Sequence, residues 1–180
     1  LEGGATIEKG GVNISRIHGE MSEALAKQLR TERVPFAVCG LSLVIHPQSP
    51  RVPTTHMNVR YFETKAGRSW FGGGIDLTPY YPHLEDFRQF HQVLKDACER
   101  VHPGSYERYK TWCDEYFTIR HRQEMRGIGG IFFDDLDGGD PNNFALVQAV
   151  GEAFLIAYLP MVQSRKDEPW TEADRQFQLV

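Results

Sequence analysis

Residues 54–64 read Thr-Thr-His-Met-Asn-Val-Arg-Tyr-Phe-Glu-Thr, and polar and apolar side chains alternate through this stretch. Successive side chains of a β-strand point to opposite faces, so the alternation predicts a strand with His56, Asn58 and Arg60 on one face. The apolar, partly β-branched run 36–46 lies just before it, across a loop that contains three prolines. The two runs are therefore expected to pair as antiparallel strands.

The segments around this pair predict a chain of the α+β class. Most strands are predicted first and most helices follow, an order typical of an antiparallel sheet with helices packed on it. No repeat or linker interrupts the chain, so residues 1–180 are expected to form a single domain. Further strands are expected over 12–17, 69–77 and 127–136, and helices over 23–30, 84–101, 105–122, 144–162 (ending or kinking before Pro160) and from 171 onward.

The composition is that of an ordinary globular protein with a small negative charge. Of the 180 residues, 41% are hydrophobic and 24% are charged, which argues against intrinsic disorder. The formal net charge is −4, so no global basic field favours nonspecific binding to nucleic acid. The longest apolar stretch, Ala153–Val162, is short and contains Pro160, so no transmembrane segment is expected.

The three cysteines are Cys39, Cys98 and Cys113. Their number is odd and their spacing is wide, which fits neither a disulfide framework nor a zinc ribbon. We expect three small, buried, reduced side chains. This pattern indicates a reducing compartment.

Five polar side chains are predicted to converge on one surface of the sheet. Ser42 and His46 share a face of their strand, as His56, Asn58 and Arg60 do on the next. Such a stripe is often just the solvated side of a sheet. The mixture of a hydroxyl, an amide, two imidazoles and a guanidinium nevertheless suits an anionic ligand.

Two further histidines, His91 and His121, continue apolar stripes of predicted helices and are expected to point inward. They are either hydrogen-bonded core side chains or part of a pocket. No pair of histidines has the local spacing of a metal motif. The spacing of the four histidines at 46, 56, 91 and 121 therefore neither supports nor excludes a metal site.

Acidic and basic clusters near the predicted strand 127–136 offer two more candidates. Asp134 and Asp135 could orient N–H donors or transfer protons, or they could cap the following turn. They do not begin a calcium loop, because the twelfth position counted from Asp135 is Leu146. The basic cluster of Arg120, His121, Arg122 and Arg126 is either a solvated helix end or a site for several carboxylates.

Several long stretches resemble the oxygen-dependent coproporphyrinogen III oxidase family. The resemblance covers essentially the whole chain. It is carried by the stretches EKGGVN (8–13), SLVIHP (42–47), PTTHMNVRYF (53–62), WFGGGIDLTP (70–79) and RGIGGIFFDDL (126–136).

The resemblance implies an enzyme of haem (porphyrin) biosynthesis. Such enzymes oxidatively decarboxylate two propionates of coproporphyrinogen III to the vinyl groups of protoporphyrinogen IX. Oxygen accepts the electrons, and carbon dioxide and hydrogen peroxide are released. The implied fold is a large, flat antiparallel sheet flanked by helices on both faces, and the implied assembly is a homodimer.

The resemblance also assigns roles to residues. His56 corresponds to the family's proton donor, and we expect Asp134 and Asp135 to act with it in proton transfer or in polarising pyrrole N–H groups. The redox chemistry is expected to need no cofactor, although bacterial members bind a divalent metal such as Mn²⁺. The implied substrate contacts are Ser42, Asn58, Val59 and Arg60, and the implied metal ligands are His46, His56, His91 and His121.

The family continues past a segment like residues 177–180, so the resemblance implies an incomplete domain whose carboxyl-terminal part is missing. The expected location is the cytoplasm, with the mitochondrial intermembrane space as the alternative. Two other functions remain open: a metal-dependent oxygenase that uses the four histidines, and a noncatalytic porphyrin-binding fragment.

Overall fold

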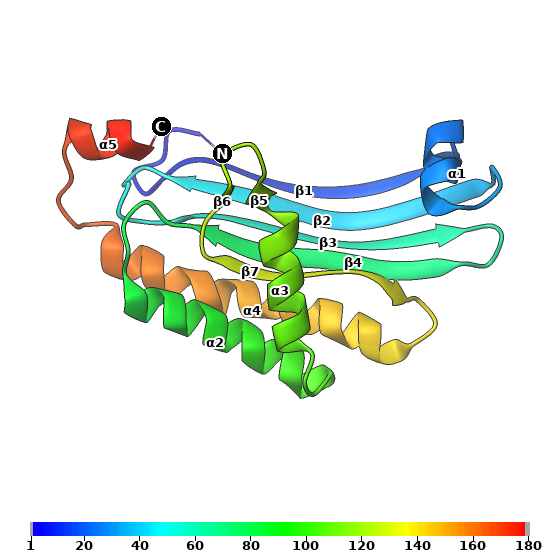
Figure 1. Cartoon of the computed structure of the whole chain (residues 1–180). Helices are drawn as coiled ribbons and strands as arrows, with labels where there is room; N and C mark the ends of the chain where they lie inside the picture. Colours follow the sequence, from blue (N-terminus) through cyan, green and yellow to red (C-terminus); the bar gives the residue numbers. More distant parts are fainter. Residues whose placement is uncertain (1, 179–180) are drawn as a thin grey trace.

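The computed structural model describes residues 2–178, and its centre is a flat, five-stranded antiparallel sheet (Figure 1). The strand order is β1-β2-β3-β4-β7, so four consecutive strands form a meander and the last one joins its edge. The α+β prediction is therefore confirmed. The strands are β1 (Ile7–Glu20), β2 (Pro35–Pro47), β3 (Thr54–Thr64), β4 (Ser69–Thr78) and β7 (Gly129–Asp137).

The pairing of β2 with β3 confirms the predicted antiparallel pair and its register. Ser42 lies opposite Asn58, and Asn58 lies opposite Gly74 of β4. Because paired residues share a face, this row and its neighbours two positions away define one polar face of the sheet. We call it the open face. It carries Ser42, His56, Asn58, Arg60, Gly72, Gly74, Asp76 and Phe132.

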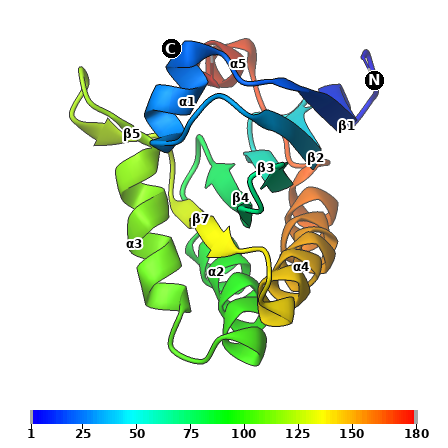
Figure 2. The ribbon, with the colours of Figure 1, turned by 90° about the vertical axis from the view of Figure 1, so that its right-hand side faces the viewer.

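The opposite face of the sheet is apolar and carries two long helices, α2 (Leu84–Val101) and α4 (Pro141–Arg165). The helices pack against each other, and α4 also packs on β3 and β4. The predicted stripe of α2 faces this core, where Phe90, Leu94 and Cys98 are fully buried. Figure 2 shows α4 and α2 on one side of the strands and α3 on the other.

The helix α3 (Tyr106–Tyr116) is shorter than predicted, because the chain leaves it for a small hairpin. Thr118 donates its hydroxyl to the carbonyl of Asp114, which closes the helix end, and Gln123 turns the chain with φ of 54°. The hairpin strands are β5 (Thr118–Ile119) and β6 (Glu124–Met125). His121 therefore lies exposed on a turn, and the prediction that it faces inward on a helix is wrong.

Three other sequence-based expectations differ from the structure. The first strand is longer than predicted, because the glycine-containing part of β1 also pairs with β2. The helix α4 continues through Pro160; Ile156, the residue whose carbonyl loses its N–H partner, lies on the solvent side. Cys39 is exposed, because β2 near the β1 edge is not covered by a helix, whereas Cys98 and Cys113 are buried.

The helix α4 is long and apolar enough to cross a membrane by length and composition alone. The expectation of no transmembrane segment rested on the longest uninterrupted apolar run, which is much shorter than α4. Half of the apolar window is buried inside the protein. Length and composition alone do not establish a membrane span.

Two short helices lie near the ends of the sheet (Figure 1). The helix α1 (Glu23–Leu29) begins at the predicted cap, since Ser22 accepts a hydrogen bond from the amide of Leu25. The helix α5 (Glu172–Gln178) has no buried residue. It is held by Asp174, which accepts hydrogen bonds from Tyr81 and Arg51.

Candidate active site

Arg60 lies on the open face and is held from two sides. Its Nη1 donates to Asn58 Oδ1 at 3.0 Å, and its Nη2 donates to Asp134 Oδ2 at 2.8 Å. The side chains of Arg60 and Asp134 are each 32% exposed, so the pair is accessible from solvent. Ser42 lies directly across from Asn58. The structure thus gathers three of the predicted substrate contacts, which are Ser42, Asn58 and Arg60.

An irregularity in the β4–β7 pairing separates the two predicted acids. The register shifts between Phe71 and Gly73, and Asp135 takes a positive φ of 54°. A bulge of this kind redirects the side chains beside it. Asp134 lies two residues after Phe132, on the same face, and reaches Arg60, whereas Asp135, at the bulge, pairs with Arg68 at 3.0 Å and is largely exposed. The structure brings Asp134 to the candidate site and does not bring Asp135.

Gly72 makes room for the Arg60–Asp134 pair. A Cβ atom at Gly72 would collide with Asp134 Oδ1 and lie 3.0 Å from Arg60 Nε. The guanidinium and the carboxylate therefore lie directly over the backbone of β4. Glycine is needed here for close approach, not for an unusual φ angle.

His56 is engaged by Asp76, a residue that the sequence analysis missed. His56 Nδ1 lies 3.0 Å from Asp76 Oδ1, and the Asp76 side chain is only 4% exposed. Arg126 donates to Asp76 Oδ2 from Nη2 at 2.6 Å and from Nε at 3.1 Å. The sequence signal for Asp76 is that it is a charged residue inside the apolar stretch 69–78. A carboxylate buried in such a strand requires hydrogen-bond or ionic partners.

An ionised carboxylate only accepts hydrogen bonds, so His56 must donate from Nδ1 to Asp76. This arrangement leaves Nε2 of neutral His56 as the acceptor. The ring of Phe117 lies edge-on to the His56 ring, with centroids 6.1 Å apart. His56 is thus held in one orientation by a carboxylate and an aromatic ring.

His91 is a fully partnered core histidine. Its Nδ1 lies 2.9 Å from the Tyr106 hydroxyl, and its Nε2 lies 3.1 Å from the carbonyl oxygen of Ile128. Burial lowers its pKa, and the nearby cation of Lys110 lowers it further. The predicted inward orientation of His91 is confirmed. Both ring nitrogens are engaged within the protein.

The other two predicted metal ligands lie elsewhere. His46 is exposed near the end of β2, where it lines a cavity of about 730 Å³ with Tyr80 and Arg175. His121 is exposed on the turn between β5 and β6. Among residues 2–178, no group of three or more His, Cys, Asp or Glu side chains could hold a metal ion. The residues as arranged do not fit a metal centre, and the four-histidine set stays a prediction.

Val59, the remaining predicted substrate contact, lies between Asn58 and Arg60, so its side chain points to the opposite face of the sheet. There it packs against the apolar core. Its side chain is therefore not on the open face. The local alternation of β3 already contained this information.

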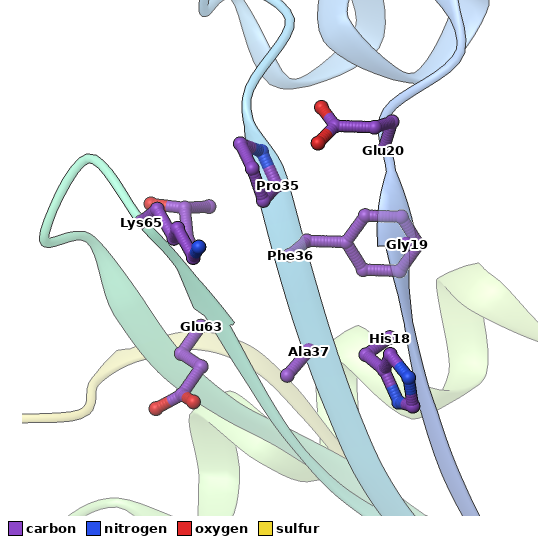
Figure 3. A pocket seen from close by; sticks show the side chains of 9 residues that line it. His18, Gly19, Glu20, Pro35, Phe36, Ala37, Glu63 and Lys65 are labelled. Atoms are coloured by element: carbon purple, nitrogen blue, oxygen red, sulfur yellow. The ribbon is translucent and has the colours of Figure 1, made fainter.

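A separate cavity of about 370 Å³ lies at the far end of the sheet (Figure 3). In Figure 3, His18 and Glu63 flank the strand that carries Ala37, with Glu20 and Lys65 nearby. None of the predicted site residues lines this cavity. It does not contribute to the cluster around Arg60 and His56.

A comparison of the whole chain with protein families gives one match. A family model described as Coproporphyrinogen III oxidase matches residues 1–180, which is the whole chain.

Proposed function

The chain belongs to the coproporphyrinogen III oxidase family, and on that premise we propose that it catalyses the oxygen-dependent oxidative decarboxylation of coproporphyrinogen III to protoporphyrinogen IX. One observation carries the proposal. A carboxylate-binding group, Arg60 with Asn58, and a proton-transfer group, His56 with Asp76, share one accessible face of the sheet.

Arg60 would bind a propionate of the substrate. A guanidinium presents a planar fork of N–H donors that matches a carboxylate. Asn58 and Asp134 use part of that fork and fix its plane, so the remaining donors are presented in one orientation. Ser42 lies across from Asn58 on the neighbouring strand, and its hydroxyl would add a further contact.

Each of the two reacting propionates would be converted in the same way. The side chain –CH₂–CH₂–COO⁻ with O₂ and one proton gives –CH=CH₂, CO₂ and H₂O₂. One C–H bond breaks at the carbon attached to the pyrrole ring, the bond between the outer methylene carbon and the carboxylate carbon breaks, and a C=C bond forms between the two methylene carbons. Two electrons pass from the substrate to oxygen, which becomes hydrogen peroxide.

The protein's part in this step is to position the substrate and exchange protons. Holding the reacting propionate against a fixed group removes much of the entropic cost of the reaction. His56 Nε2 would exchange the proton, with Asp76 holding the ring in the required tautomer. Asp134, next to Arg60, would accept hydrogen bonds from pyrrole N–H groups. Asp135 would not share this role, since it pairs with Arg68 away from the Arg60 cluster.

We expect no redox cofactor, because the reduced, electron-rich macrocycle can itself react with oxygen. The homodimer and the cytoplasmic location, with the mitochondrial intermembrane space as its alternative, also stay expectations from the resemblance. Sedimentation velocity tests the dimer directly. A species of one chain's mass, 20.6 kDa, at all concentrations would contradict it.

The function is tested by product analysis. The protein is given coproporphyrinogen III with and without oxygen, and the oxidised products are separated by porphyrin fluorescence. We expect protoporphyrin only with oxygen, and none from His56→Ala. Binding of the substrate without turnover would instead support the noncatalytic porphyrin-binding function. Turnover that a chelator abolishes would support the metal-dependent oxygenase.

A further inference from the structure

We infer that Arg126 is a positioning residue that acts on His56 through Asp76, from the base of the β5–β6 hairpin. The inference rests on the proposed function, since it assigns Arg126 to the same site. Arg126 lies on the segment between β6 and β7 and not on a strand of the open face. In the sequence analysis it was only one member of a basic cluster.

The two oxygens of Asp76 are divided between two partners. Both contacts from Arg126 go to Oδ2, at 2.6 and 3.1 Å, whereas His56 Nδ1 approaches Oδ1 at 3.0 Å. The Asp76 side chain is almost completely buried, so water does not determine its orientation. With Oδ2 fixed by the guanidinium, rotation of the carboxylate is blocked, and Oδ1 holds the imidazole in place.

Arg126 is itself fixed by three contacts outside this pair. Its guanidinium carbon lies 3.9 Å from the centre of the Phe117 ring. Its amide donates to the carbonyl of Phe117, and its carbonyl accepts from the Thr78 hydroxyl at 2.9 Å. Since Phe117 also lies edge-on to His56, the four side chains of His56, Asp76, Arg126 and Phe117 form a closed ring of contacts.

The ring of contacts joins the hairpin to the open face. Figure 1 shows α3 leading up to β5, and the chain returning from β6 to β7. The backbone of this return is tied to β4 through Thr78 and through the amide of Ile128, which donates to Leu77. Arg126 consequently stands where the hairpin meets the sheet, and its side chain reaches in to the buried carboxylate.

A purely structural role would be to neutralise buried Asp76. The two roles predict different results. A structural role predicts loss of folding stability, with kcat and KM of the folded fraction unchanged. A positioning role predicts a lower kcat with nearly unchanged KM, because the misoriented imidazole affects proton transfer and not propionate binding.

The test compares Arg126→Met and Arg126→Lys with the control Arg122→Met. Arg122 lies on the same hairpin, but its partner is exposed Glu124 at 3.2 Å. We expect Arg126→Met to lower kcat about 10- to 100-fold while KM changes less than about 3-fold. Arg126→Lys should recover part of kcat, and the control should match the wild type. Wild-type kcat in Arg126→Met would overturn the inference.

A second readout does not depend on turnover, so it separates this inference from the proposed function. The ¹⁵N signals of the His56 ring, recorded at about pH 8, report which nitrogen carries the proton. The wild type should show the proton on Nδ1, and Arg126→Met should show a mixture of tautomers. Arg126→Lys keeps a positive charge next to Asp76, so the test can still be made if Arg126→Met fails to fold. Unchanged His56 signals in both Arg126 variants would overturn the inference even if the enzyme is active.

Discussion

Asn58 and Asp134 hold the guanidinium of Arg60, the proposed propionate contact, in one orientation. We predict that Arg60→Met lowers kcat/KM by about 100-fold, or about 2.7 kcal/mol, through loss of a charge-assisted, bidentate contact. The steady-state kinetics should be measured beside Arg68→Met. That control removes an equally charged side chain whose partner, Asp135, is exposed. Equal effects of the two substitutions would contradict the role of Arg60.

Asp134 and Asp135 are neighbours in sequence with different surroundings, so their substitutions should differ. Asp134→Asn removes the ion pair that orients Arg60, and we expect kcat/KM to fall about 10-fold. Asp135→Asn breaks only an exposed ion pair and should leave the kinetics close to the wild type. A larger loss in Asp135→Asn than in Asp134→Asn would show that the bulge does not divide the two acids as described.

Gly72 is predicted to be intolerant of even a methyl group. The Cβ atom of Gly72→Ala would meet Asp134 Oδ1 and Arg60 Nε, so the pair must move off the strand. We expect substrate affinity, measured as the Kd for coproporphyrin III, to weaken about 10-fold. Gly11→Ala on β1 is a matched control, since nothing lies within 4 Å of its Cβ position. An unchanged Kd in Gly72→Ala would contradict the close approach.

At the scale of whole elements, α5 is held by the carboxylate of Asp174 and by the ion pair of Arg175 with Glu8 at 2.6 Å. Hydrogen bonds from Tyr81 and Thr171, with the nearby charge of Arg51, lower the pKa of Asp174 from 3.8 to about 2. A carboxyl whose pKa is lower in the folded state stabilises that state above the unfolded pKa. This contribution is lost as the pH falls through about 2.

We therefore predict a pH-dependent difference between the wild type and Asp174→Asn. The wild type should have the higher melting temperature at about pH 6, and the difference should shrink between about pH 4 and pH 2. Thermal melts across this range measure it. A difference that is already absent at about pH 6, or that stays constant down to about pH 2, would contradict the anchoring of α5.

The sequence predicted helices and strands well where the apolar residues followed a single helical or strand periodicity. Alternation in β3 fixed both the strand and the residues of its polar face, and the helical spacing of α2 placed His91 inward. The end of α3 was not predictable in this way. Phe117 continues the apolar stripe of α3, but it turns instead to Arg126 and His56 across the hairpin.

At the scale of the whole molecule, the site depends on contacts between distant parts of the chain. Arg60 meets Asp134, and Asp76 meets Arg126, across 74 and 50 residues of sequence. Local spacing contains no information on such pairs, so Asp76 was missed and Asp135 was chosen together with Asp134. The alternation of β7 places Asp134 on the open face, and the bulge turns Asp135 outward to Arg68.

The central claim is that the open face around Arg60 and His56 binds the tetrapyrrole. It is tested most directly by titrating ¹⁵N-labelled protein with coproporphyrin III, the stable oxidised form that keeps all four propionates, and following the backbone amide signals. We predict the largest shifts at residues 42, 56–60, 72–76 and 134. Shifts confined to the far cavity around residues 18, 37 and 63, or no shifts at saturating ligand, would contradict the claim.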